Sequence, residues 1–127
     1  MSIEKVREFM RERGFEDKIL EFSVSSATVE LAAEAVGTEG KRIAKSLSFL
    51  VDGKAVMIVA AGDGRIDNKK YKAEFSCKAK MLSPEQVDNM IGHSIGGVCP
   101  FAVNEGVQVY LDESLKRFET VFPACGS

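Results

Sequence analysis

Two neighbouring apolar runs give the chain its clearest structural signal. Residues 44–51 and 54–61 are rich in branched and other apolar side chains, and only Asp52 and Gly53 lie between them. An Asp-Gly pair between two such runs is typical of a two-residue hairpin turn, because both central residues of that turn adopt positive φ angles. The pattern therefore predicts an antiparallel β-hairpin over residues 44–61.

A lysine occurs within the first of these strands. Side chains alternate between the two faces of a strand, so Lys45 shares its face with large apolar residues, namely Ile43, Leu47, Phe49 and Val51. The pattern leaves two interpretations open. Either the ammonium group escapes to solvent at the start of the strand, or the methylene stem is buried and the charge stands at the mouth of a pocket.

Apolar residues at helical spacing predict four helices, each bounded by residues that favour helix ends. These helices cover residues 3–13 up to Gly14, residues 29–36 from a cap at Ser26 or Thr28 to Gly37, residues 68–75 after Asp67, and residues 84–91 between Ser83 and Gly92. In the last of them, Pro84 occupies the first helical position and Gln86 completes a capping box with Ser83.

Shorter apolar runs predict extended segments at residues 19–25, 79–82, 107–111 and 118–122, with a helical turn at residues 112–116. Helices and strands thus alternate irregularly, which favours a mixed α/β fold over a regular doubly wound one. A chain of 127 residues with 45% hydrophobic and 28% charged content suits one domain over residues 1–127.

Composition narrows the possible classes of protein. No stretch reaches the roughly 18 apolar residues of a membrane span, and the charged N-terminal segment lacks a signal-peptide core, so a soluble cytoplasmic protein is predicted. Three cysteines without a CxxC spacing and a single histidine suggest neither a disulfide framework nor a metal site. No cofactor is predicted.

The net charge of −2 argues against a protein that coats nucleic acid through its overall field, and no DNA or membrane partner is predicted. Basic residues do cluster locally, at Lys41, Arg42 and Lys45 and again at Lys69, Lys70, Lys72, Lys78 and Lys80. A solvated surface is the ordinary explanation of such clusters, and a local contact with nucleic acid is the other.

The segment GHSIGGVCPF, residues 92–101, is the most unusual loop in the chain. Its adjacent glycines allow main-chain N–H groups to approach a ligand, because no Cβ stands in the way. A binding loop and a plain connection between helix and strand are both consistent with this composition.

Several segments together resemble one family. RIAKSLSFLVDGKAVMIVAAGD, IDNKKYKAEF, LSPEQVDNMIGHSIGGVCPF and VYLDESL occur in the order and spacing of the YbaK/prolyl-tRNA editing-domain family, over about residues 20–127. The resemblance implies a curved, partly barrel-like mixed β-sheet flanked by helices. It also implies an enzyme that hydrolyses the ester between a wrong amino acid and the 3′ end of a tRNA, generally the tRNA for proline.

The same resemblance assigns the site residues. Lys45 polarises the ester or meets a phosphate, and main-chain amides around Gly96 and Gly97 stabilise the tetrahedral oxyanion. The residues implied to bind substrate are Thr28, Val98, Cys99, Pro100, Phe101 and Gly126. The implied partners are the acceptor end of an aminoacyl-tRNA and prolyl-tRNA synthetase. Water attacks with help from the substrate's own groups, and alanine, serine and cysteine all remain possible as the amino acid removed.

Two alternatives stay open. His93 and Cys99 could form the base and nucleophile of a thiol-dependent hydrolase. A protein that binds the tRNA acceptor end or a synthetase without catalysis is the other. Members of the family usually continue into one more strand or helix that helps to close the site, so a C-terminal element is expected to be missing after Ser127.

Overall fold

The computed structural model describes residues 2–22 and 28–126, and its centre is the predicted hairpin. Strands β1 (Ile43–Val51) and β2 (Lys54–Ala61) pair antiparallel from Val51 opposite Lys54 to Ala44 opposite Ala61. Asp52 and Gly53 turn the chain with φ angles of 50° and 74°. Both angles are positive, as the Asp-Gly pair predicted.

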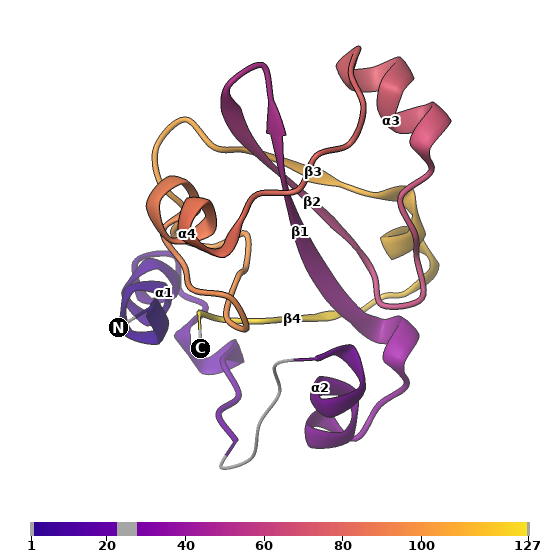
Figure 1. The fold of residues 1–127 in the computed structure, drawn as a ribbon. Coiled ribbons are helices and arrows are strands. Elements are labelled where there is room, and N and C mark those ends of the chain that lie inside the picture. The colour runs from indigo at the N-terminus through magenta and orange to yellow at the C-terminus, as the bar shows by residue number, and fades with distance from the viewer. Residues whose placement is uncertain (1, 23–27, 127) are drawn as a thin grey trace.

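Two short strands extend the hairpin into a curved, mixed four-stranded sheet of order β3-β2-β1-β4 (Figure 1). Strand β3 (Gln108–Leu111) runs parallel to β2, and β4 (Phe122–Pro123) runs parallel to β1. The predicted fold class, a mixed α/β protein with a curved sheet and flanking helices, is confirmed.

Both faces of the sheet are covered. On one face, Leu47 and Phe49 of β1 pack with Tyr71 and Phe75 of α3 (Asn68–Phe75), which Asp67 caps as predicted. On the other face, Met57 and Val59 of β2 pack with Leu82 and with Val87 and Ile91 of the π-helical turn η3 (Val87–Ile91), which follows the short helix α4 (Pro84–Gln86). The alternation of the strands thus feeds two separate apolar clusters.

The remaining helices flank one end of the sheet. Helix α1 (Ser2–Glu12) packs Val6 and Met10 against Cys99 in a third cluster, and the 3₁₀ turn η1 (Glu16–Lys18) follows it. Helix α2 (Val29–Val36) begins at the cap Thr28 and ends at Gly37, where φ is 81°. The other proposed cap, Ser26, lies outside the described residues. Two further 3₁₀ turns are η2 (Gly40–Arg42) and η4 (Glu113–Arg117).

Two of the predicted strands are wrong as regular strands. Residues 79–82 make only an isolated bridge between Met81 and Phe49, together with two main-chain hydrogen bonds to β1. Residues 118–122 contribute only Phe122, because β4 pairs with β1 at Ile43 and Ala44 alone. An apolar run supplies side chains for burial, but strand pairing also needs a neighbouring strand edge to which the main chain can bond. Residues 19–22 form no regular strand, and 23–25 lie outside the described residues.

The described residues contain neither a candidate membrane span nor a candidate metal-binding cluster. No helix among them is long and apolar enough to cross a membrane. No group of three or more histidine, cysteine or acidic side chains among them is placed to hold a metal ion.

Candidate functional site

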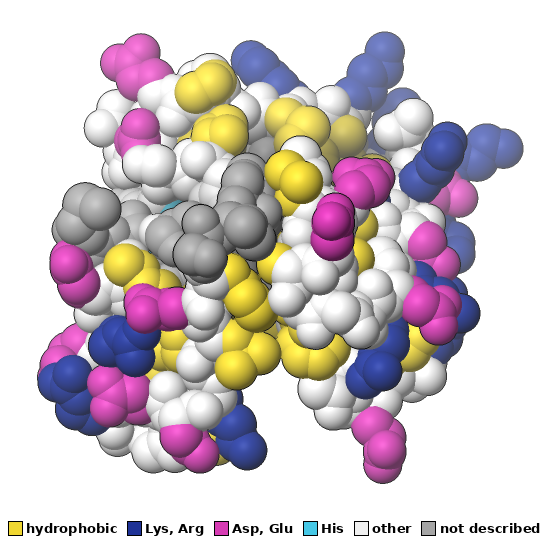
Figure 2. Space-filling model, turned by 90° about the horizontal axis from the view of Figure 1, so that it is seen from below, with side chains coloured by type: hydrophobic (Ala, Val, Ile, Leu, Met, Phe, Trp, Pro, Cys, Tyr) yellow, Lys and Arg dark blue, Asp and Glu magenta, His cyan; other side chains and the backbone are white. Residues whose placement is uncertain are grey.

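A cavity of about 630 Å³ opens between η1, α2, the start of β1, the segment before α4, the glycine loop and β4. Figure 2, which views the molecule from below, shows hydrophobic side chains gathered in a hollow near the middle of this face, with charged side chains toward its outline. A volume of this size is typical of small-molecule sites, and mostly apolar walls are typical of them too.

The cavity collects residues that are far apart in sequence. Five of the predicted site residues line it, and four do not. The lining residues are Thr28, Lys45, Gly96, Val98 and Phe101; Gly97, Cys99, Pro100 and Gly126 do not line it. The lysine strand and part of the glycine loop therefore border one cavity.

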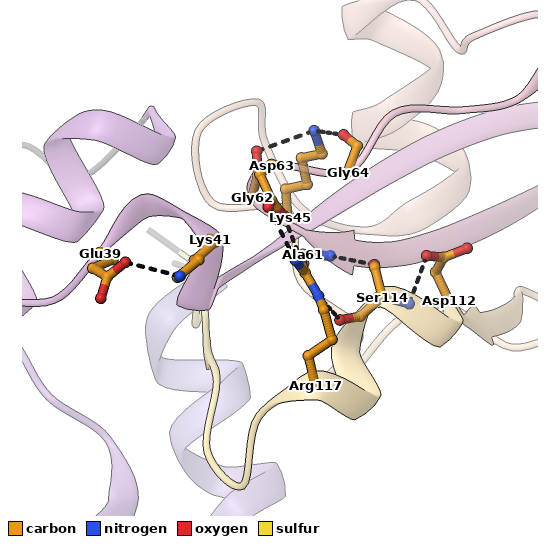
Figure 3. A network of polar contacts seen from close by, with 10 residues as sticks. All are labelled: Glu39, Lys41, Lys45, Ala61, Gly62, Asp63, Gly64, Asp112, Ser114 and Arg117. Carbon is orange, nitrogen blue, oxygen red and sulfur yellow. Dashed lines mark hydrogen bonds and ion pairs between the residues drawn. The ribbon is translucent and has the colours of Figure 1, made fainter.

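The ammonium group of Lys45 is held by main-chain oxygens. Its Nζ donates to the carbonyl of Gly62 at 3.4 Å and also to the carbonyl of Gly64 (Figure 3). The residue is half-buried, and by register it lies on the same face as Leu47 and Phe49. The face assignment is thus confirmed. An ammonium group has three donors, so two carbonyls leave one donor for another acceptor.

The turn that holds Lys45, residues 62–64, is held in place by contacts with η4 and η2. Arg117 of η4 binds both carboxylate oxygens of Asp63, and this hydrogen-bonded pair lowers the pKa of the Asp63 carboxyl (Figure 3). The Ala61 N–H donates to the Ser114 hydroxyl at 3.0 Å. A Cβ built on Gly62 would lie 2.0 Å from the Gly40 carbonyl oxygen. Residue 62 must therefore lack a side chain for η2 to approach.

The glycine loop differs from its predicted role in one respect. The N–H of Gly97 donates to the Ser94 carbonyl at 3.0 Å, so it is occupied within the loop. Among the described residues, the N–H groups of Gly96 and Val98 have no acceptor. Gly96 has a φ of 96°, a conformation that glycine adopts readily because it has no Cβ. Gly96 and Val98, which both line the cavity, thus have amides without an acceptor among the described residues.

The structure brings His93 and Cys99 together but not as a nucleophile and base. The Cys99 Sγ lies 3.5 Å from the His93 Nε2. That nitrogen is 2.7 Å from the Phe101 carbonyl, so it carries the proton and cannot accept one from the thiol. Burial raises the pKa of the Cys99 thiol to about 12. Cys99 also does not line the cavity, so the geometry argues against the thiol-hydrolase alternative.

The buried imidazole makes stability depend on pH. His93 is 1% exposed, and burial lowers its pKa from its ordinary value near 6.5. A lowered pKa in the folded state means that the unfolded chain binds a proton first as the pH falls. We expect the free energy of unfolding to decrease as the pH falls below about 6.5, with a slope of at most about 1.4 kcal/mol per pH unit, the limit for one proton.

Urea unfolding at pH 7.5 and 5.5 measures this effect, since the carboxylates remain mostly ionised across that window. His93 is the single histidine of the chain, so a His93→Gln variant serves as the control and should show a much flatter dependence. An equal decrease in both proteins would assign it to other groups.

The structure also locates two other predicted site residues, Thr28 and Gly126. The Thr28 hydroxyl accepts from the Leu31 N–H at 3.1 Å as the cap of α2, while the residue also borders the cavity. Gly126 is buried, with a φ of 94°. A substrate role for either residue stays a prediction.

Sequence reasoning missed Ser46 and Ser48, which line the cavity beside Lys45. Small polar residues at alternate positions resemble the solvent side of a strand, so the pattern offered no signal of burial. The available signal was weaker: the second run of the hairpin, residues 55–61, is continuously apolar, as in strands covered on both faces.

Comparison with known proteins places this geometry in context. The sequence model of a family described as "Aminoacyl-tRNA editing domain" matches residues 24–127. The uncharacterized protein YwhH of Bacillus subtilis (strain 168) is 56% identical over all of this chain, which spans 82% of YwhH. Proline–tRNA ligase of Lactiplantibacillus plantarum is 29% identical over 70% of this chain, which matches only 16% of the ligase.

Solved structures agree with the sequence matches. A proposed trans-editing enzyme for prolyl tRNA synthetase superimposes with a TM-score of 0.88 at 34% identity, and the match covers 99% of this chain and 81% of the other. The family match covers most of the chain, and the fold of a relative above 30% identity is shared nearly throughout. The chain belongs to the aminoacyl-tRNA editing domain family.

Proposed function

We propose that this protein is a trans-editing hydrolase that removes a small wrong amino acid from the 3′ end of a tRNA, with the tRNA for proline as its principal substrate. The observation that carries the proposal is one cavity bordered by Lys45 and by the glycine loop, in a member of an editing family. Among its relatives are proline–tRNA ligases and a proposed trans-editing enzyme for the prolyl synthetase, which favours this tRNA.

In the proposed mechanism a water oxygen adds to the ester carbonyl carbon. We assign the hydrogen bonds to the resulting oxyanion to the N–H groups of Gly96 and Val98, and we assign the third donor of Lys45 to a substrate oxygen. Collapse breaks the bond to the ribose oxygen, which leaves as a hydroxyl, and the amino acid leaves as a carboxylate. Charge stabilisation of this kind acts strongly in a cavity with little water.

The proton of the attacking water needs an acceptor. Asp17 is the one carboxylate among the described residues that line the cavity, and it is exposed on η1. We therefore assign proton removal to the substrate itself, through its ribose hydroxyl, its amine or its side chain. Pro100 fixes φ near the exit of the loop and so keeps the Gly96–Val98 segment in place.

A local contact with tRNA suits the charge of the protein. The net charge of −2 argues against broad neutralisation of phosphates as the source of affinity. The proposed contact is confined to the acceptor end, and prolyl-tRNA synthetase is the proposed partner that supplies the remaining contacts with the tRNA.

A panel of mischarged tRNAs tests the proposed function. Radiolabelled alanine, serine, cysteine and threonine esters of the tRNA for proline are incubated with the protein, and release of the free amino acid is measured against correctly charged tRNA. Rapid release from at least one mischarged tRNA is expected. Binding of these tRNAs without release would instead favour the non-catalytic binding module.

Replacing Cys99 by alanine distinguishes ester hydrolysis by water from thiol catalysis. We expect the rate of deacylation to stay within about threefold of the wild-type rate, because a thiol with a pKa near 12 supplies almost no thiolate at neutral pH. Removing a buried side chain should still lower the free energy of unfolding by about 1–2 kcal/mol. Near-complete loss of hydrolysis in a folded variant would restore the thiol mechanism.

A further inference from the structure

One stretch of β1, residues 45–47, has no neighbour along the strand edge that faces away from β2. Strand β4 pairs with β1 at Ile43 and Ala44 only. Beyond the gap, the Leu82 N–H donates to the Ser48 carbonyl at 3.1 Å and the Leu50 N–H donates to the Lys80 carbonyl at 2.8 Å. Among the described residues, none pairs with residues 45–47 on this side.

The open stretch exposes main-chain groups of Ser46 to the cavity edge. In an antiparallel ladder the N–H and C=O of one residue point to the same side, and successive residues alternate. The bonds of Ser48 and Leu50 show that even-numbered residues of β1 face away from β2. The N–H and C=O of Ser46 therefore face the open edge, without a partner among the described residues.

Two hydroxyl groups lie on the cavity side of the same stretch. The Oγ atoms of Ser46 and Ser48 are buried and have no hydrogen-bond partner among the described residues. Both residues line the cavity, and Ser48 is only 5% exposed. Their registered partners on β2 are Val59 and Met57, so the hydroxyls stand in otherwise apolar surroundings.

Buried hydroxyls of this kind are unusual. A buried polar group that lacks a partner destabilises the fold, and most such groups in proteins are satisfied. Alanine would fit in the same space without that penalty. Ala44, two residues before Ser46 on the same face of β1, is an example. Rotation about χ1 moves a serine hydroxyl among three staggered positions, so either oxygen can turn toward a molecule in the cavity.

We propose that Ser46 and Ser48 select aminoacyl groups whose side chain carries a hydroxyl or another small hydrogen-bonding group. This inference rests on the proposed function. The α-ammonium group is common to all aminoacyl esters, and the free C=O of Ser46 at the strand edge is a suitable acceptor for it. The two hydroxyls are then left to distinguish the side chains.

The selectivity depends on whether the two serine hydroxyls find hydrogen-bond partners when an aminoacyl group enters the cavity. An apolar side chain of equal size leaves both serine hydroxyls buried and unpaired, whereas a side-chain hydroxyl can donate to one of them and accept from the other. A site with buried hydrogen-bonding groups strongly disfavours a ligand that cannot form hydrogen bonds with them. A purely apolar site disfavours a ligand with an extra hydroxyl group much less.

A pair of stable analogues tests the inference without requiring hydrolysis. Seryl and 2-aminobutyryl amides of 3′-amino-3′-deoxyadenosine differ by a hydroxyl in place of a methyl group, and calorimetry gives the Kd of each. We expect the wild-type protein to bind the seryl analogue at least tenfold more tightly. In Ser48→Ala, and in the Ser46→Ala/Ser48→Ala double variant, the ratio should fall to within about twofold.

The matched control is Tyr71→Phe. Tyr71 OH is also buried without a partner among the described residues, but Tyr71 lies in the cluster around α3 and does not line the cavity. Tyr71→Phe should keep the wild-type ratio. Because each change removes an unsatisfied hydroxyl, neither Ser48→Ala nor Tyr71→Phe should lower the Tm. A Ser48→Ala variant with a clearly lower Tm would mean a structural role for that hydroxyl and would overturn the inference.

Three further results would overturn it: equal or reversed Kd values in the wild-type protein, a ratio that survives both serine changes, or failure of both analogues to bind. The panel of mischarged tRNAs distinguishes failure of the inference about the serines from failure of the proposed function. Hydrolysis of a mischarged tRNA together with an unselective cavity would leave the deacylase intact and remove only the role of the serines.

Discussion

Replacing Lys45 by alanine is expected to slow the deacylation of mischarged tRNA by on the order of 10²–10³-fold, while the protein stays folded. Loss of a single preorganised donor to an oxyanion commonly has an effect of this size. The loss should fall mainly on kcat, because the charge of the ester oxygens develops in the transition state.

The expected change in stability is small. The carbonyls of Gly62 and Gly64 lose a donor, but they lie in a turn at the surface end of β2 where water replaces it. A decrease of about 1 kcal/mol in the free energy of unfolding is therefore expected. Single-turnover deacylation and thermal unfolding are the two measurements.

Two further variants separate charge from packing. Lys45→Met keeps an unbranched side chain of similar length without the charge, and it should be as slow as Lys45→Ala. Lys54→Ala removes an exposed lysine at the far end of the same hairpin and should leave the rate unchanged. A folded Lys45→Ala protein with a rate near the wild-type rate would exclude Lys45 from catalysis and would leave it the single role of fixing the 62–64 turn.

The second large effect is expected for Gly62→Ala. The new Cβ would lie 2.0 Å from the Gly40 carbonyl oxygen and 2.9 Å from the Val29 Cγ1. The nearer obstacle is main chain, which cannot rotate away as a side chain can, so η2 and the 62–64 turn must separate. We expect the free energy of unfolding to fall by about 2–3 kcal/mol.

The same displacement should also slow deacylation, because the Gly62 carbonyl is one of the two acceptors that hold the Lys45 ammonium. Urea unfolding and the deacylation assay together measure the two effects. If stability falls but the rate stays at the wild-type level, the turn does not position Lys45.

Gly106→Ala is the matched control. Gly106 has a φ of 90°, yet a Cβ added to it would meet nothing within 4 Å. Its substitution therefore reports the penalty of a left-handed backbone alone, about 1–2 kcal/mol. Gly62 is not among the glycines with a positive φ, so a free energy of unfolding near the wild-type value in Gly62→Ala would mean that steric contact with η2 is not what requires glycine there.

The features that could be predicted from the sequence are those decided by neighbours in the chain. The turn at Asp52 and Gly53, the cap at Asp67 and the capping box of Ser83 with Gln86 all form as predicted. Each depends on contacts within three or four residues, so the local sequence contains the required information. Strand residues 79–82 and 118–122 were predicted wrongly because their pairing depends on the distant β1.

The site, like the fold, combines features that the sequence predicts with features that depend on the tertiary structure. Lys45 and the glycine loop were recognised through the family resemblance, and the structure places Lys45 and Gly96 at one cavity. The carbonyls that hold the ammonium, the occupied N–H of Gly97 and the protonated nitrogen of His93 could not be predicted. Each involves the three-dimensional path of a loop, for which a single sequence carries little signal.

The alternation along β1 by itself determined that Lys45 and Leu47 share one face and that Ser46 and Ser48 share the other. Only the tertiary structure decided that both faces are covered, one by α3 and the other by Leu82 and η3. The physical reason is that side-chain direction in a strand is set by the local backbone, whereas burial is set by whichever distant segments pack against it. The two serines therefore looked like surface residues in the sequence and are cavity residues in the folded protein.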